Sequence, residues 1–293
     1  IVSASGVTDH FDAFRRGLSE LGWIDGQNVR IEYRYAEHQH ERLPTLTREL
    51  IEAKVDVLMC SSTVTVLAAK KATSTVPIVF ASVFDPVASG IVATLSRPGG
   101  NVTGATIGVG GSGTAGKWLE LAKELVPGAT RVAVFHNSRN PASAQSVREI
   151  QSAAKRLDTR LDMLDVATDH ELAKALAAVR AGSARAIIVT NDPFFTAKRD
   201  DLVRLAADKR LPAVYFFSTF VDAGGLMSYG GSRDESLQRA ATLVSKILNG
   251  AKPGDLPVEQ STRIELVISR KAANAIGLAI PPSLLVRADR IIE

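Results

Sequence analysis

The sequence is short of cysteine and of long apolar runs, and each shortage excludes a class of protein. Its one cysteine, Cys60, cannot form an internal disulfide or a cysteine-based metal cluster, although it does not indicate a redox compartment. Cys60 ends the apolar run 55–59, so we expect it to be a small buried core residue. The longest apolar stretches, such as 186–189 and 276–282, are far shorter than the ~20 residues of a membrane-spanning helix.

The sequence also lacks a large excess of charge of one sign. The chain has 35 Lys and Arg against 31 Asp and Glu, a formal net charge of +4, and the two signs are mostly interleaved rather than gathered in a stripe. We therefore expect no nucleic-acid partner. Hydrophobic residues make up 45% and charged residues 23%, which is typical of a globular protein and excludes a disordered chain.

Short β-branched runs alternate with helical patterns along the 293 residues, a length that predicts two domains. The first part predicts strands over 1–4, 28–35, 55–60, 77–82 and 102–107, and helices over 11–21, 43–53, 64–73 and 90–96. The pattern then restarts and predicts helices over 114–125, 142–157, 169–181, 194–209 and 234–249, and strands over 131–136, 160–165, 186–190, 213–217 and 264–269. Repeated βαβ units of this kind form parallel sheets.

The fold class predicted is therefore α/β, with two doubly wound parallel-sheet lobes joined by a hinge that the chain crosses several times. Lobe one is predicted to comprise 1–107 and 229–260, and lobe two 108–228 and 261–293. Glycine, serine and threonine near 107–113, 228–230 and 259–263 can absorb torsion changes, so we place the hinge there.

The glycine-rich segment 111–117 is the one motif that looks enzymatic. It matches the first seven positions of a phosphate-binding loop, but Trp118 stands where that loop needs a Ser or Thr hydroxyl for Mg²⁺. We interpret it as a flexible linker. None of the five histidines forms a metal-binding pair, and no nucleophile elbow occurs. The residues thus predict no catalysis, no metal and no cofactor.

Polar and aromatic residues gather just after predicted strands, where open α/β sheets bind ligands. The candidate ligand-binding residues of lobe one are Ser5, His10, Ser61, Ser62, Thr63, Phe84 and Asp85, with Thr106 at the hinge. Those of lobe two are Asn137, Asn140, Asn191, Asp192 and Tyr215. Residues 61–63 precede a helix, so they suit a carboxylate, although plain N-capping explains the same hydroxyls.

Two further features bear on the ligand. Asp85 and Asp192 each precede a proline, where a carboxylate can hold an ammonium group or simply form a turn. Aromatic residues are only 5% of the chain yet fall at strand ends, which suits an aromatic ligand or core packing equally. Together these favour an amino acid or a related aromatic or branched acid, bound against Phe84 and Tyr215, over a sugar.

Short motifs throughout the chain are similar to those of a known family. They lie at 14–18 (Phe-Arg-Arg-Gly-Leu), 21–23 (Leu-Gly-Trp), 26–29, 76–80, 85–87, 97–104, 116–117, 119–121, 123–128, 211–213, 224–230 and 280–289. With these motifs the chain resembles the ABC transporter substrate-binding proteins that include tryptophan and tyrosine uptake components. At 61–63 it departs from the family, which often has Gly and Ala there, so ligand identity does not carry over.

The resemblance implies a type I periplasmic-binding fold, no enzymatic activity, and delivery of a small-molecule ligand, captured between the lobes, to an ABC permease in the inner membrane. It also implies a protein that acts outside the cytoplasm, in the periplasm or lipid-anchored before trimming. We expect it to be a monomer. Because the sequence begins at Ile1 inside an expected strand, we expect a signal peptide to have been removed. A regulator's ligand-sensing domain and a small-molecule enzyme remain the alternatives on this fold.

Overall fold

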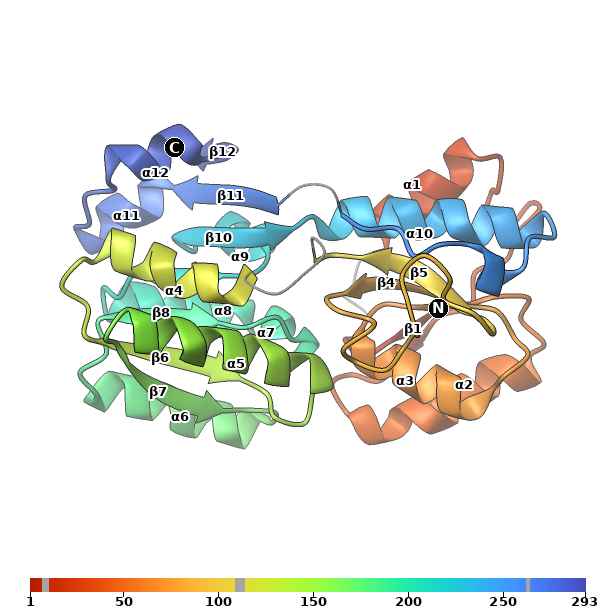
Figure 1. The fold of residues 1–293 in the computed structure, drawn as a ribbon, viewed down its shortest axis with the longest axis horizontal. Helices are drawn as coiled ribbons and strands as arrows, with labels where there is room; N and C mark the ends of the chain where they lie inside the picture. Colours follow the sequence, from red (N-terminus) through yellow and green to blue (C-terminus); the bar gives the residue numbers. More distant parts are fainter. Residues whose placement is uncertain (7–10, 109–113, 262–263) are drawn as a thin grey trace. The chain divides into compact units, whose positions relative to one another are not determined.

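The computed structural model describes residues 1–6, 11–108, 114–261 and 264–293, which form two compact units (Figure 1). Unit 1 consists of Ile1–Gly110 and Ser232–Thr262, and unit 2 of Gly111–Gly231 and Arg263–Glu293. The three crossings thus fall two to three residues later in the chain than the positions expected from the sequence. Residues 109–113 and 262–263, which include the first three residues of the glycine-rich segment, lie outside the described residues.

Unit 1 has a five-stranded parallel sheet of order β2-β1-β3-β4-β5. Its strands are β1 (Val2–Ser3), β2 (Arg34–Tyr35), β3 (Leu58–Cys60), β4 (Ile78–Val83) and β5 (Val102–Thr106). Its helices are α1 (Asp12–Glu20), α2 (Leu43–Glu52), α3 (Thr63–Ala72) and α10 (Arg233–Leu248), with short 3-10 turns η1 (His40–Arg42) and η2 (Pro253–Asp255).

The unit 1 sheet is covered on both faces because successive strand residues point to opposite sides. Met59 and Val79 pack with α1 and α10, which lie side by side above the sheet in Figure 1. Cys60 and Phe80, one residue further along each strand, pack instead with α2 and α3. Strands buried on both faces read as continuous apolar runs, which is why the sequence pattern located them.

Unit 2 has a seven-stranded sheet of order β12-β11-β10-β9-β8-β6-β7, parallel except for the antiparallel pair β10 and β11. Its strands are β6 (Arg131–His136), β7 (Arg160–Asp165), β8 (Ala186–Val189), β9 (Ala213–Tyr215), β10 (Met227–Gly231), β11 (Ile264–Ser269) and β12 (Arg290–Ile292). Its helices are α4 (Thr114–Leu125), α5 (Pro141–Arg156), α6 (Asp169–Ala181), α7 (Pro193–Ala197), α8 (Arg199–Asp208), α9 (Ser218–Asp222), α11 (Arg270–Ile276) and α12 (Pro282–Arg287).

Helices also cover both faces of the unit 2 sheet. Helices α4 and α5 pack together in front of it in Figure 1, and Trp118 of α4 meets Phe216 edge to face with 5.8 Å between ring centroids. On the other face, Phe195 of α7 packs against Phe135 of β6 in the same manner. The expectation of two α/β lobes with mostly parallel sheets is confirmed.

Several local predictions are wrong for tertiary reasons. No helix forms over 90–96, because the Nζ of Lys70 hydrogen-bonds the carbonyl oxygens of Gly90 and Ile91 and so occupies groups that a helix would use. The helix expected over 194–209 is broken at Lys198 into α7 and α8. The strand expected over 28–35 is reduced to β2, while α9, α11, α12 and β12 carried no sequence prediction.

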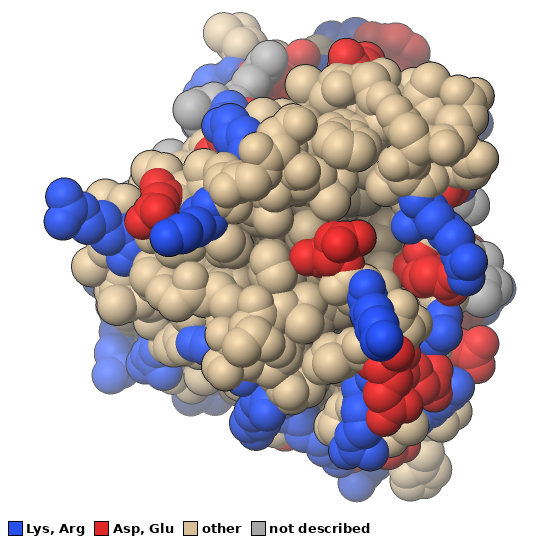
Figure 2. Space-filling view, turned by 90° about the vertical axis from the view of Figure 1, so that its right-hand side faces the viewer, with Lys and Arg blue, Asp and Glu red and all other residues tan. Residues whose placement is uncertain are grey.

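One expectation about the hinge also changes. Residues 228–230, predicted as a hinge segment, lie in the middle of β10, where every residue pairs with β11. On the face of the molecule in Figure 2, Lys and Arg side chains lie next to Asp and Glu, as the interleaved sequence predicts. Among the described residues, no helix is long and apolar enough to cross a membrane, and no His, Cys, Asp and Glu cluster is suited to a metal ion.

Candidate functional site

The predicted ligand-binding residues that the structure describes lie at the carboxyl edges of the two sheets, the edges to which the parallel strands point. We call these the unit 1 edge, after β3, β4 and β5, and the unit 2 edge, after β6, β8 and β9. Doubly wound sheets bind ligands at such edges because loops and helix N-termini converge there.

Residues 61–63 connect β3 to α3 at the unit 1 edge, and all three side chains are buried. Ser62 is the N-cap of α3: its N–H donates to Thr65 Oγ1 over 3.0 Å, and Thr65 Oγ1 donates back to the Ser62 carbonyl oxygen over 2.7 Å. The capping interpretation is therefore correct locally. Hydroxyls at the first turn of a ten-residue helix also suit an anion, so the two interpretations coexist.

The other unit 1 candidates have structural partners. Asp85 accepts hydrogen bonds from the N–H groups of Val87 and Ala88 with the same Oδ1 atom, which makes it the turn residue that its position before proline also allowed. Thr106 Oγ1 donates to the Gly108 carbonyl oxygen over 2.9 Å. Phe84 is buried and Ser5 is half-buried, whereas His10 lies outside the described residues.

The unit 2 edge is organised around the buried carboxylate of Asp192. Asp192 Oδ2 accepts from the side-chain amides of Asn140 (2.8 Å) and Asn137 (3.1 Å), while Oδ1 accepts from the Phe194 N–H (2.8 Å). The three side chains are at most 3% exposed. Because β6 and β8 are neighbours in the sheet, residues more than 50 positions apart in sequence meet here. Asn191 precedes this cluster and is half-buried.

Tyr215, at the end of β9, is completely buried in unit 2. Its ring stacks on Phe220 with 4.6 Å between centroids, and burial raises its hydroxyl pKa above the usual value. Its hydroxyl has no hydrogen-bond partner among the described residues. The core-packing interpretation of this aromatic is therefore correct, and its contact with a ligand stays a prediction.

Two residues of these edges escaped the sequence analysis. Ser82, near the end of β4, is a buried non-glycine residue with a positive φ of 59°, and no local sequence signal marks it. His136, the last residue of β6, lies 3.9 Å from Asp165 through its Nδ1 atom. Burial lowers the pKa of His136, and the Asp165 carboxylate opposes this effect.

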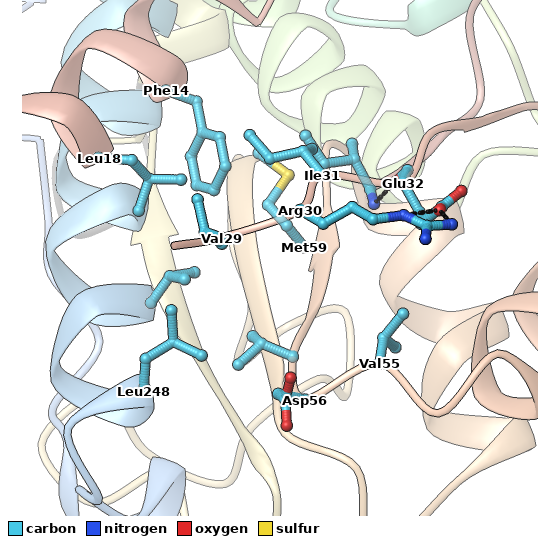
Figure 3. A pocket seen from close by; sticks show the side chains of 13 residues that line it. Phe14, Leu18, Val29, Arg30, Ile31, Glu32, Val55, Asp56, Met59 and Leu248 are labelled. Atoms are coloured by element: carbon cyan, nitrogen blue, oxygen red, sulfur yellow. Dashed lines mark hydrogen bonds and ion pairs between the residues drawn. The ribbon is translucent and has the colours of Figure 1, made fainter. Parts of the chain in front are cut away.

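An apolar cavity of unit 1 lies at the opposite edge of its sheet (Figure 3). Phe14, Leu18, Met59 and Leu248 surround it, and Arg30 forms an ion pair with Glu32 at its side. Its volume of about 110 Å³ is well below the ~300 Å³ of small ligand sites. We therefore do not assign it to the ligand.

Comparison with known proteins identifies the family. The sequence profile described as ABC transporter substrate binding protein matches residues 1–292. The chain belongs to this family. Its members are substrate-binding proteins of ABC systems: they bind small molecules outside the cytoplasm, and their partner is an ABC permease. The resemblance noted from short motifs is thus confirmed over the whole chain.

Individual relatives agree with this assignment. A tyrosine-binding protein of Clostridioides difficile (strain R20291) is 26% identical over 265 residues, which are 90% of this chain and 75% of that protein. A conserved domain protein of Vibrio cholerae has a similar structure, with a TM-score of 0.89, 26% identity and coverage of 99% and 98% of the two chains. An ABC domain of Streptococcus pneumoniae in complex with L-Trp shares the fold, with a TM-score of 0.89, 24% identity and the same coverage.

Lys117 is the last residue of the glycine-rich motif. In the structure it lies in the first turn of α4 and forms an ion pair with Glu120 over 2.9 Å. The described part of the motif, 114–117, thus lies in α4, as the helix predicted over 114–125 requires, and is not a flexible linker.

Proposed function

We propose that this substrate-binding protein captures an aromatic amino acid and delivers it to its ABC permease. The observation that carries the proposal is the Asp192 cluster: three donors fix the orientation of a buried carboxylate at the edge where this fold binds ligands. An oriented carboxylate is suited to a ligand ammonium group, because charge-assisted hydrogen bonds are stronger than neutral ones.

The hydroxyls and backbone N–H groups at 61–63 are proposed to bind the ligand carboxylate. They stand at the N-terminus of α3, whose helix dipole favours negative charge. The tyrosine-binding relative and the L-Trp complex support an aromatic side chain in the same ligand. We further propose that the protein acts as a monomer and contacts its permease at the membrane surface without entering the bilayer.

A thermal-shift and calorimetry series tests the ligand class. The series comprises L-tryptophan, L-tyrosine, tryptamine without the carboxylate, indole-3-propionate without the ammonium group, and a neutral sugar. An amino acid at ~100 times its Kd should add ~2.7 kcal/mol of stability, whereas both truncated analogues should bind more weakly. Stabilisation by the sugar, with none by any carboxylate, would contradict the proposal.

A further inference from the structure

Ser82 has a conformation that a serine rarely adopts in a strand. Its φ of 59° falls in the left-handed region, and it lies in β4 where the register with β5 shifts between Phe80 and Val83. A left-handed conformation costs free energy for any residue with a Cβ, and glycine is the usual residue at such a position. A serine at this position therefore suggests that its side chain has a role that offsets the cost of the conformation.

The backbone of Ser82 is held by the returning helix α10. Its N–H donates to Ser236 Oγ over 2.9 Å, and Ser236 Oγ donates in turn to the Ala105 carbonyl oxygen of β5 over 3.0 Å. Both serines are buried, and Ser236 is completely so. These bonds stabilise the unusual backbone without using the Ser82 hydroxyl.

The Ser82 hydroxyl itself makes none of these hydrogen bonds. Ser82 is 8% exposed, and its Oγ atom has no hydrogen-bond partner among the residues that the structure describes. A buried hydroxyl without a partner destabilises a fold, because it loses its hydrogen bonds to water and gains none in return. Strain and an unused donor at one position are typical of a residue that serves a ligand.

Ser82 also lies at the unit 1 edge, close to the segment proposed to bind the carboxylate. Strands β3 and β4 are neighbours, with Cys60 paired to Phe80, so the residues that follow each strand lie at the same edge of the sheet. Residues 61–63 follow β3, and Ser82 lies two positions after Phe80 on β4. The proposed carboxylate-binding segment and the unused hydroxyl thus come from adjacent strands.

We propose that the Ser82 hydroxyl donates a hydrogen bond to the carboxylate of the bound amino acid. This assignment rests on the proposed function and adds to it a specificity-determining residue. Ser236 is a positioning residue that holds Ser82 in the left-handed conformation.

The test compares Ser82→Ala and Ser82→Gly with wild type in titrations with L-tryptophan, L-tyrosine and tryptamine, and in thermal unfolding without ligand. Both substitutions should weaken binding of the two amino acids about tenfold and leave tryptamine unchanged. Without ligand, Ser82→Ala should be at least as stable as wild type, and Ser82→Gly more stable, because glycine relieves the backbone strain.

Ser245→Ala is the matched control, since Ser245 is also 8% exposed in unit 1 but accepts a hydrogen bond from Trp23 Nε1 over 2.9 Å. It should lower stability and leave affinity unchanged. Amino acid binding that is unaffected by Ser82→Ala would overturn the assignment. A loss of stability in ligand-free Ser82→Ala equal to that of the control would also overturn it. The stability measurement needs no ligand, so it tests the assignment even if wild type binds none of the probes. Failure of wild type to bind any probe would refute the proposed function itself.

Discussion

The two sheet edges differ in how their polar groups are held. At the unit 2 edge, the Asp192 carboxylate has three donors fixed on it, and the asparagines that supply two of them are buried with it. At the unit 1 edge, hydroxyls predominate, and one of them, on Ser82, lacks a partner among the described residues. A fixed carboxylate is suited to a cation, whereas hydroxyl and N–H donors are suited to an anion. The proposed function assigns these roles to the two charged groups of an amino acid.

The strongest way to break this comparison is Asp192→Asn, which removes the charge and keeps the shape. It should weaken L-tryptophan binding 10- to 100-fold, because a charge-assisted hydrogen bond contributes ~1.5–3 kcal/mol. Binding of indole-3-propionate, which has no ammonium group, should change little. Calorimetry with both ligands measures the difference.

Asp165→Asn is the control for this substitution. Asp165 is the last residue of β7 in the same sheet. Its carboxylate accepts hydrogen bonds from the N–H and hydroxyl groups of Ser138. It should leave both affinities unchanged. If Asp192→Asn weakened the two ligands equally, Asp192 would be a structural residue of the edge and not the partner of an ammonium group.

The sequence predicted the members of the Asp192 cluster but could not bring them together. Asn137, Asn140 and Asp192 were each selected because they follow a strand, which periodicity locates well. Their meeting depends on β8 lying beside β6, although β7 comes between them in the chain. Strand order of this kind is set by packing of whole helices and strands, for which a local pattern carries no signal.

Two departures from the local pattern also involve distant contacts. The helix predicted over 90–96 is lost to a lysine about 20 residues earlier, and the left-handed Ser82 depends on Ser236, 154 positions later. By contrast, most helices of both units begin and end within a residue or two of the expected positions, because amphipathic spacing and their terminal residues are local. Local chemistry thus predicted most of the elements, whereas distant contacts decided how the candidate residues are arranged.

A smaller effect sharpens the comparison at the unit 1 edge. Ser62→Ala removes the N-cap of α3 and should lower stability by ~1 kcal/mol, and L-tryptophan affinity should fall several-fold as well. Thr168→Ala is the matched control in unit 2, because Thr168 caps α6 by accepting from the Glu171 N–H. It should show a similar stability loss in urea unfolding. An equal loss of affinity in both variants would mean that the cap affects binding through stability alone.

The smallest expected effect concerns pH, and it separates the edges because serine and threonine hydroxyls do not titrate near neutrality. Burial lowers the pKa of His136 below its ordinary value of 6.5, although Asp165 opposes this. Between the folded and unfolded pKa values of this histidine, the unfolded chain binds more protons. The contribution of His136 to the free energy of unfolding is therefore fully present above about pH 6.5 and is lost as the pH falls below that value. His136→Gln should flatten this part of the curve of unfolding free energy against pH, measured by urea denaturation from pH 7.5 to 5. A wild-type slope that survives in His136→Gln would place the pH-sensitive group elsewhere and remove this distinction between the two edges.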